Sequence, residues 1–141
     1  MKIEIQRKSG AFHLEARNEH GNTVQTDASP AIGGTDKGMR PMELLLSALG
    51  ACSSIDVIEL LRKQRQQLDD IQINVSGERA KDQVPAVFTD IHIHFTLTGP
   101  VLDDDKVRRA LELSVKKLCS VGKMLEKTAV ITYDYTIKNN A

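Results

Sequence analysis

Two cysteines, Cys52 and Cys119, are the residues of this chain whose chemistry points most directly to a reaction. A thiolate is a strong side-chain nucleophile near neutral pH, and a second thiol within reach lets the oxidised form close reversibly to a disulfide. Each cysteine lies on a predicted helix beside small or polar residues, which would leave room for a substrate or a disulfide. If the two thiols meet in the folded protein, the pattern indicates a redox protein.

The alternative for both cysteines is a purely structural role in the core of a dimer, because free cysteine is among the most buried residue types. The predicted position of Cys52 is also far from the helix N-terminus, whose positive end would favour a thiolate. Activation would need a neighbouring charge. The candidates are three arginines, each of which is more often a solvated surface charge: Arg7, Arg17 and Arg40.

Glu43 is the candidate for a carboxylate that would orient such an arginine. Nine residues along a helix span about 13.5 Å and about half a rotation, so Glu43 and Cys52 cannot touch within one helix. A bridging arginine or a second subunit would have to connect them. The alternative is a first-turn glutamate that complements the helix dipole.

His92 and His94 are two residues apart on a predicted strand and therefore point to the same face, as in a metal-binding His-x-His pair. No third ligand is nearby in the sequence. Asp90, Thr96 and Thr98 share the face, which favours an ordinary polar surface. We predict no metal site and no cofactor.

Composition places the chain among globular proteins. Its 141 residues fit one domain, predicted to span residues 1–141, with 40% hydrophobic and 27% charged residues. Lysine plus arginine balances aspartate plus glutamate at 19 each, which argues against nucleic acid as a partner. The N-terminus lacks the apolar core of a signal peptide, and no run approaches the roughly 18 apolar residues of a membrane helix. We therefore expect a cytoplasmic protein with no membrane partner.

Hydrophobic periodicity predicts an α+β chain. In the first part, residues 2–7 and 11–17 read as a hairpin and residues 23–26 as a short strand, and residues 29–40 read as a mobile loop. Pro41 begins a long helix that ends near residue 64. Residues 44–52 are apolar or small all round, so this part of the helix must be covered on every side, most easily by a second subunit.

The second part alternates strands and helices. Residues 71–76 and 87–97 read as two long antiparallel strands, and residues 129–138 read as the last strand. Residues 103–105 supply an N-cap and acidic first turn for a helix with apolar positions at helical spacing, and residues 121–126 read as a short helical turn. The apolar positions of the longer helix are Val107, Ala110, Leu111, Val115 and Leu118, with Cys119 inclined toward the same core face.

The two segments that contain the cysteines carry a resemblance to a known family. Residues 41–52, Pro-Met-Glu-Leu-Leu-Leu-Ser-Ala-Leu-Gly-Ala-Cys, and residues 118–121, Leu-Cys-Ser-Val, resemble the OsmC/Ohr superfamily, and the resemblance covers essentially the whole chain. Further segments are similar to its YhfA-type branch, whose members are mostly uncharacterised: residues 50–57, 76–79, 88–95 and 123–127.

The resemblance implies an OsmC-like fold in which antiparallel sheets wrap around the long central helices of an intertwined homodimer. Characterised relatives reduce organic hydroperoxides. Carried over, Cys52 would attack the peroxide and become a sulfenic acid, Cys119 would close the disulfide, and a dithiol reductant such as a lipoyl protein would restore both thiols. The paired sites would lie at the dimer interface under the 29–40 loop.

This sequence departs from the peroxidase pattern in two places. Relatives commonly place glutamate directly after the helix-starting proline, whereas Met42 holds that position here and Glu43 follows. The arginine expected before the glycine-rich loop has no counterpart in residues 22–28.

The leading prediction is therefore a thiol peroxidase that reduces organic hydroperoxides in oxidative or osmotic stress defence, with Cys52, Cys119 and Glu43 at its site. The alternative is a non-enzymatic binding or stress-protection protein of the same fold. Its interface groove would hold a small apolar molecule.

Overall fold

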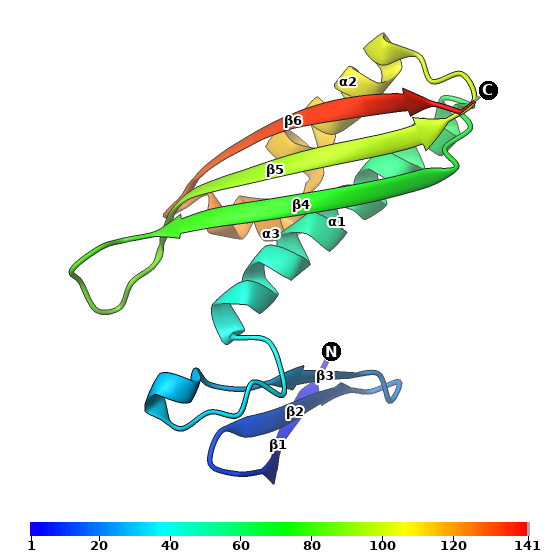
Figure 1. Ribbon diagram of the computed structural model, residues 1–141. Helices are drawn as coiled ribbons and strands as arrows, with labels where there is room; N and C mark the ends of the chain where they lie inside the picture. Colours follow the sequence, from blue (N-terminus) through cyan, green and yellow to red (C-terminus); the bar gives the residue numbers. More distant parts are fainter. Residues whose placement is uncertain (141) are drawn as a thin grey trace. The chain divides into compact units, whose positions relative to one another are not determined.

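The computed structural model describes residues 1–140 as an α+β chain (Figure 1). The chain forms two compact units, Met1–Leu45 and Leu46 onward, with the boundary inside the helix α1, Pro41–Lys63. The α+β class is confirmed, and one domain over residues 1–141 stays a prediction.

The first unit contains a three-stranded antiparallel sheet in the order β1-β2-β3. The strands are β1, Ile3–Ser9, β2, His13–Asn18, and β3, Thr23–Thr26. Gly10 turns the chain between β1 and β2 with a φ of 58°, a conformation that glycine adopts without a steric penalty. The predicted hairpin and short strand are confirmed.

Asp27 organises the segment that was predicted as a mobile loop. This segment contains the 3₁₀ turn η1, Pro30–Ile32. Asp27 is 3% exposed, and its carboxylate accepts hydrogen bonds from Thr35 Oγ1 at 2.7 Å and from the backbone amides of Ala28, Thr35 and Lys37 at 2.7, 3.2 and 3.1 Å. These bonds, with the Thr35 hydroxyl first, hold the pKa of Asp27 well below its usual range. One buried carboxylate therefore ties both ends of the segment together.

We expect Asp27→Asn to speed amide hydrogen exchange at Thr35 and Lys37 by about tenfold or more, because the amide side chain offers one acceptor oxygen and no charge. In the wild type, the low folded-state pKa means that Asp27 contributes stability at pH values above its ordinary pKa of 3.8. That contribution is lost as the pH falls from there toward the folded-state pKa. Glu4→Gln on the exposed surface of β1 is the control, and equal exchange rates in both variants would contradict this role.

The second unit is built on a three-stranded sheet in the order β4-β5-β6. Its strands are β4, Asp70–Arg79, β5, Phe88–Gly99, and β6, Val130–Asn139. The predicted antiparallel pairing of β4 with β5 is confirmed. β6 pairs with β5 in parallel, so the expectation of wholly antiparallel sheets is wrong for this pair. The physical reason is the helical crossover between β5 and β6, which returns the chain to the end where β5 began.

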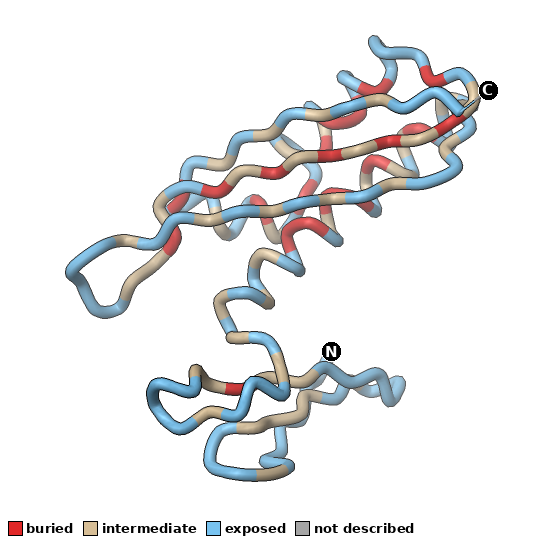
Figure 2. The backbone as a smooth tube through the Cα atoms, in the orientation of Figure 1, coloured by how far each residue is buried: buried red, intermediate tan, exposed pale blue. Residues whose placement is uncertain are grey.

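Helices cover one face of this sheet (Figure 1). They are α1, α2, Asp104–Leu113, the π-helical turn η2, Ser114–Leu118, and α3, Ser120–Leu125. Figure 2 shows buried residues gathered along β5 and on the helices behind it. The largest fully buried apolar side chains are the following: Leu49, Val57, Leu61, Ile91, Ile93, Phe95, Leu97, Val107 and Leu111.

The π turn changes which side chains face this core. The predicted helix through Leu118 and Cys119 would bury Leu118, but Leu118 is 50% exposed, while Ser114 and Cys119 are buried. Cys119 is not on a helix, since its backbone is extended, with φ −69° and ψ 110°, between η2 and α3. The wider turn adds a residue to the helical repeat, and this addition rotates the following side chains out of the predicted register.

α1 is long and apolar enough to cross a membrane by length and composition alone. This corrects the expectation that no run approaches such a span. The same length and composition occur in core helices of globular proteins. Only about a third of its apolar part is buried in one chain, so much of an apolar helix is left uncovered.

Candidate functional site

The structure brings the two thiols together in the second unit. Cys52 lies on α1 and Cys119 lies between η2 and α3. The Sγ atoms of both cysteines and a carboxylate oxygen of Asp56 all lie within 4.8 Å of one another. Cys52 is partly exposed and Cys119 is 3% exposed, and both are free. The arrangement gives one accessible thiol with a second, enclosed thiol close behind it.

Close packing of α1 on the sheet sets the position of Cys52. Gly50 is buried, and a Cβ atom at this position would lie 3.0 Å from Val75 Cγ2 on β4. A side chain here would crowd the Val75 methyl group, so glycine suits the close approach of α1 to the sheet. The following residues Ser53 and Ser54 are also buried, which fixes the rotation of the helix around Cys52.

Two donors hold the Cys119 sulfur. Ser53 Oγ donates to Cys119 Sγ over 3.4 Å, and the Gly122 amide donates over 3.3 Å as Cys119 caps the start of α3. Burial raises the pKa of the Cys119 thiol above its ordinary value, and the neighbouring Cys52 raises it further, while the two donors oppose the shift. Cys119 is therefore held as a neutral thiol pointing at its partner.

A buried hydrogen bond joins the two segments that carry the cysteines. Ser114 Oγ donates to the carbonyl oxygen of Ser53 over 2.8 Å, and both residues are fully buried. This bond links the first residue of η2 to the residue that follows Cys52. It fixes the spacing between the π turn and α1.

We expect Ser114→Ala to lower the free energy of unfolding by about 1 to 2 kcal/mol, because the buried Ser53 carbonyl loses this donor. Urea denaturation measures the change. The control is Ser120→Ala, which removes an exposed hydroxyl from the first turn of α3. If the two substitutions cost the same, the Ser114 bond does not support the site.

Asp56 is the site residue that sequence reasoning missed. It lies one helical turn after Cys52, and the i, i+4 spacing on α1 was the signal that could have found it. Its Oδ2 atom is buried and, within residues 1–140, has no hydrogen-bond partner. A buried carboxylate oxygen without a donor is costly, so this atom lacks a partner that buried polar atoms normally have.

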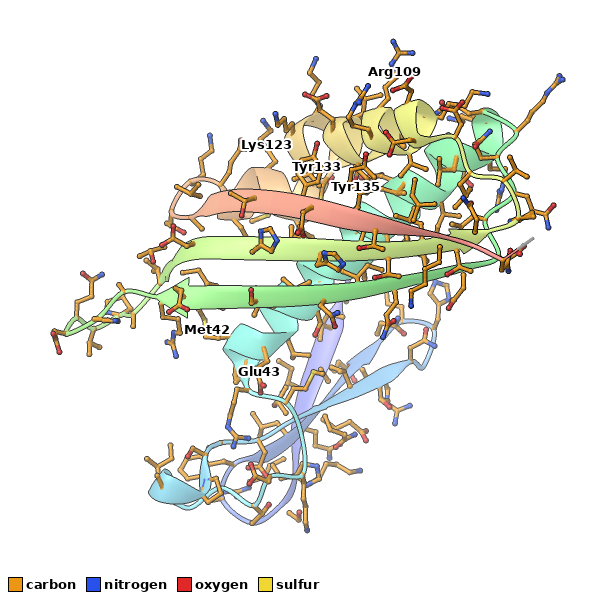
Figure 3. All side chains as sticks on the ribbon, turned by 45° about the horizontal axis from the view of Figure 1, so that its top comes forward. Met42, Glu43, Arg109, Lys123, Tyr133 and Tyr135 are labelled. Carbon is orange, nitrogen blue, oxygen red and sulfur yellow. The ribbon has the colours of Figure 1, made fainter. Side chains whose placement is uncertain are left out.

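Glu43 lies in the first turn of α1, in the first unit (Figure 3). Its carboxylate accepts the Arg40 amide over 2.8 Å, in the manner of a capping glutamate. This contact matches the alternative of a glutamate that stabilises the helix start. A role for Glu43 beside the thiols stays a prediction.

The candidate arginines also lie in the first unit. Arg40 pairs with Asp36, and its guanidinium donates to the Gly38 carbonyl over 3.4 Å. Arg17 pairs with Glu15 over 3.3 Å, and Arg7 lies on β1. Activation of Cys52 by any of them stays a prediction.

His92 and His94 share one carboxylate on the outer face of the second sheet. His92 Nε2 and His94 Nδ1 lie 2.8 and 2.7 Å from Asp134 Oδ1 on β6. These two contacts hold the pKa of Asp134 below its ordinary value. The predicted polar face is thus a hydrogen-bonded surface network. On the other face of β6, the Tyr135 hydroxyl donates to Asp104 of α2 over 2.8 Å (Figure 3).

Comparison with known proteins places this geometry in a family. The family of OsmC-like proteins matches residues 34–134, which include both cysteines and Asp56. The chain is 45% identical to Protein YhfA of Escherichia coli strain K12 over 102 residues, 72% of this chain and 75% of YhfA. The fold is similar to that of a putative osmotic stress induced and detoxification response protein from Psychrobacter arcticus, with 19% identity, 96% of each chain and a TM-score of 0.83. It is also similar to an organic hydroperoxide resistance protein OsmC from Legionella pneumophila, with 10% identity, 96% of this chain, 97% of that chain and a TM-score of 0.71. The match over most of the chain shows that this protein belongs to the OsmC-like family.

Proposed function

We propose that this protein reduces organic hydroperoxides through Cys52 and Cys119, as part of a defence against oxidative stress. The observation that carries the proposal is the pair of sulfur atoms within 4.8 Å, one partly exposed and one buried. Membership of the OsmC-like family supports it, as does the shared fold with a protein named for organic hydroperoxide resistance.

The difference in exposure between the two thiols supports the roles that we propose for them. The Cys52 thiolate attacks the terminal peroxide oxygen, the O–O bond breaks, and the alcohol leaves after taking up a proton, so that Cys52 becomes a sulfenic acid. Cys119 then gives up its proton and attacks the Cys52 sulfur, the S–O bond of the sulfenic acid breaks, a disulfide forms, and the hydroxide leaves with the proton as water. A dithiol reductant, for which a lipoyl protein is our candidate, returns both thiols by exchange.

A buried Cys119 suits the second step. Its raised pKa keeps it a thiol while the peroxide reacts at Cys52, and its 3% exposure keeps the peroxide away from it. Both cysteines are free in the structure, which suits a reducing compartment, and we place the protein in the cytoplasm.

Stopped-flow measurement of alkyl hydroperoxide consumption by the reduced protein tests the proposal. We expect a rate at least about a hundredfold above that of a free dithiol at the same thiol concentration. One hydroperoxide should be consumed per chain, with a mass loss of about two hydrogen atoms as the disulfide closes. A rate no faster than that of the free dithiol would refute the enzyme and leave the binding protein as the alternative.

We also propose that the protein is a homodimer joined through α1. Ala48, Ala51 and Ile55 form an exposed apolar stripe beside Cys52, and Ile55 is 63% exposed in one chain. An uncovered apolar stripe on a helix of this hydropathy is typical of an interface. If the protein binds a small apolar molecule without turnover, this stripe is also the surface that the molecule would contact.

We expect Ile55→Glu to raise the dimer dissociation constant by about a hundredfold or more, because a carboxylate would be buried without a partner. Sedimentation velocity over a range of protein concentrations measures this change. Lys63→Glu introduces the same side chain at the exposed end of α1 and is the control. A wild-type chain that stays monomeric, or an Ile55→Glu variant that associates like the wild type, would contradict the proposed interface.

A further inference from the structure

Cys52, Cys119 and Asp56 form a set of three possible metal ligands at the thiol site. The proposed reaction uses only the two cysteines. Cys52 and Asp56 face the same side of α1 because they are one helical turn apart. Cys119 reaches them from the extended residue before α3. The sulfurs and a carboxylate oxygen lie within 4.8 Å of one another, while tetrahedral zinc ligands with Zn–S bonds of about 2.3 Å are about 3.5 to 3.8 Å apart. Small side-chain rotations therefore bring all three onto one ion.

The unpartnered oxygen of Asp56 points to a cation. Oδ2 is buried and accepts no hydrogen bond from the residues that the structure describes. A carboxylate oxygen of the same residue lies within 4.8 Å of the two cysteine sulfurs. A divalent cation at the centre of the three groups would give the unpartnered carboxylate a partner.

The surroundings of Cys119 suit a metal-bound thiolate. Its sulfur already accepts from Ser53 Oγ–H and the Gly122 amide. Outer hydrogen bonds of this kind fix the direction of a metal ligand. The Ser114 bond to Ser53 holds the first of these donors in place.

We propose that the reduced protein binds one Zn²⁺ ion per chain through Cys52 Sγ, Cys119 Sγ and the Asp56 carboxylate. Two thiolates with one carboxylate select zinc over magnesium or calcium, which take oxygen ligands. Three protein ligands leave the fourth position open, so the ion is exchangeable and accessible to a small thiol or to water.

His92, His94 and Asp134 on the second sheet form another set of possible metal ligands in the described residues, and this set is the weaker candidate. Both of its histidines already contact one oxygen of Asp134, and their other ring nitrogens contact the hydroxyls of Thr132 and Thr136 at 2.7 and 3.3 Å. All of these groups have partners without an ion. Asp134 therefore provides a matched control for Asp56.

Zinc binding and disulfide formation exclude each other, because both need the same two sulfurs. When a hydroperoxide oxidises the zinc-bound pair, two electrons leave the thiolates, two protons are taken up, and the products are the disulfide, an alcohol, water and free Zn²⁺. This consequence rests on the proposed function. The zinc site itself does not.

The test uses reduced, metal-free, untagged protein under anaerobic conditions. Zn²⁺ is titrated in competition with a chromophoric chelator, and Co²⁺ replaces zinc to report the ligands by its absorption spectrum. We expect one ion per chain, thiolate-to-cobalt charge-transfer absorption, and the visible bands of a tetrahedral ion. Asp56→Asn should weaken zinc binding by about tenfold or more, Cys119→Ser should remove about half of the charge-transfer intensity, and Asp134→Asn should change neither.

Several outcomes would overturn the zinc site: no saturable binding below about micromolar Zn²⁺, equal affinity in Asp56→Asn and the wild type, or loss of binding in Asp134→Asn. Circular dichroism checks that each variant is folded, and Cys52→Ser decides the question if Asp56→Asn does not fold. Because binding is measured without a hydroperoxide, failure of the zinc site and failure of the peroxidase are separate results.

Discussion

Cys52→Ser will lower the rate of alkyl hydroperoxide consumption by about a thousandfold, to the level of a solution without the protein. A serine hydroxyl at this position is not ionised near neutral pH and cannot form a sulfenic acid. The enclosed Cys119, 3% exposed, cannot replace it as the residue that meets the peroxide. Stopped-flow kinetics with the metal-free, reduced variant measure the effect.

Cys119→Ser is the matched variant, and its expected result is different. The first hydroperoxide is still consumed at Cys52, because the accessible thiol is unchanged, but the sulfenic acid has no partner and accumulates. A sulfenic-acid trap followed by intact mass measurement detects it. Steady turnover with a dithiol reductant should fall by about tenfold or more, since the reductant must then attack Cys52 directly. If both variants lose the first turnover equally, or if Cys52→Ser keeps it, the assigned roles are wrong.

Local sequence rules predicted most of the elements of this fold. Pro41 begins α1, Asp103 accepts the Lys106 amide as the N-cap of α2, and the alternating residues of β4 and β5 face the core as predicted. These features depend on residues close in sequence, such as caps, turns and the strand period of two. Such information is present in any single sequence.

The direction of β6 and the register after Leu113 depend on contacts that no local pattern contains. A strand that alternates like Ile131 and Tyr133 fits a parallel or an antiparallel neighbour equally well. The sequence pattern did not reveal the π turn, because Val115 and Leu118 fit an ordinary helical repeat. The bond from Ser114 to Ser53 across the core accompanies the wider turn, after which Leu118 is exposed while Cys119 is buried.

Both cysteines of the candidate site were predicted from the sequence, but its carboxylate, Asp56, was not. Thiol chemistry pointed to Cys52 and Cys119, and the resemblance to the OsmC/Ohr superfamily implied their pairing, whereas Glu43 was expected as the carboxylate that would orient an arginine beside them. Glu43 caps the start of α1, whereas Asp56 lies within 4.8 Å of both sulfurs. A residue four positions after a reactive cysteine on a helix shares its face, so the spacing alone favoured Asp56.

Phe95→Ala should lower the free energy of unfolding by about 3 to 5 kcal/mol, the largest stability effect that we expect in this chain. Phe95 is fully buried at the centre of β5, opposite Ile73 on β4 and Tyr135 on β6. Removal of the ring leaves a cavity between the sheet and the helices, which cannot collapse without moving both. The loss is a large part of the roughly 5 to 15 kcal/mol by which domains of this size are stable.

Urea denaturation of reduced protein at one fixed concentration measures this loss, because association of chains would otherwise change the apparent stability. Phe95→Leu, which keeps most of the apolar volume, should cost about 1.5 kcal/mol or less. Thr96→Ala, on the opposite face of the same strand, should cost about 1 kcal/mol or less. The order Phe95→Ala, Phe95→Leu, Thr96→Ala follows from buried volume alone, so an equal cost for Phe95→Ala and Thr96→Ala would contradict a core centred on β5.

Since α1 carries Cys52 and packs its buried residues on this core, the same loss should loosen the thiol site. Disulfide closure in Phe95→Ala should then be slower than in Thr96→Ala.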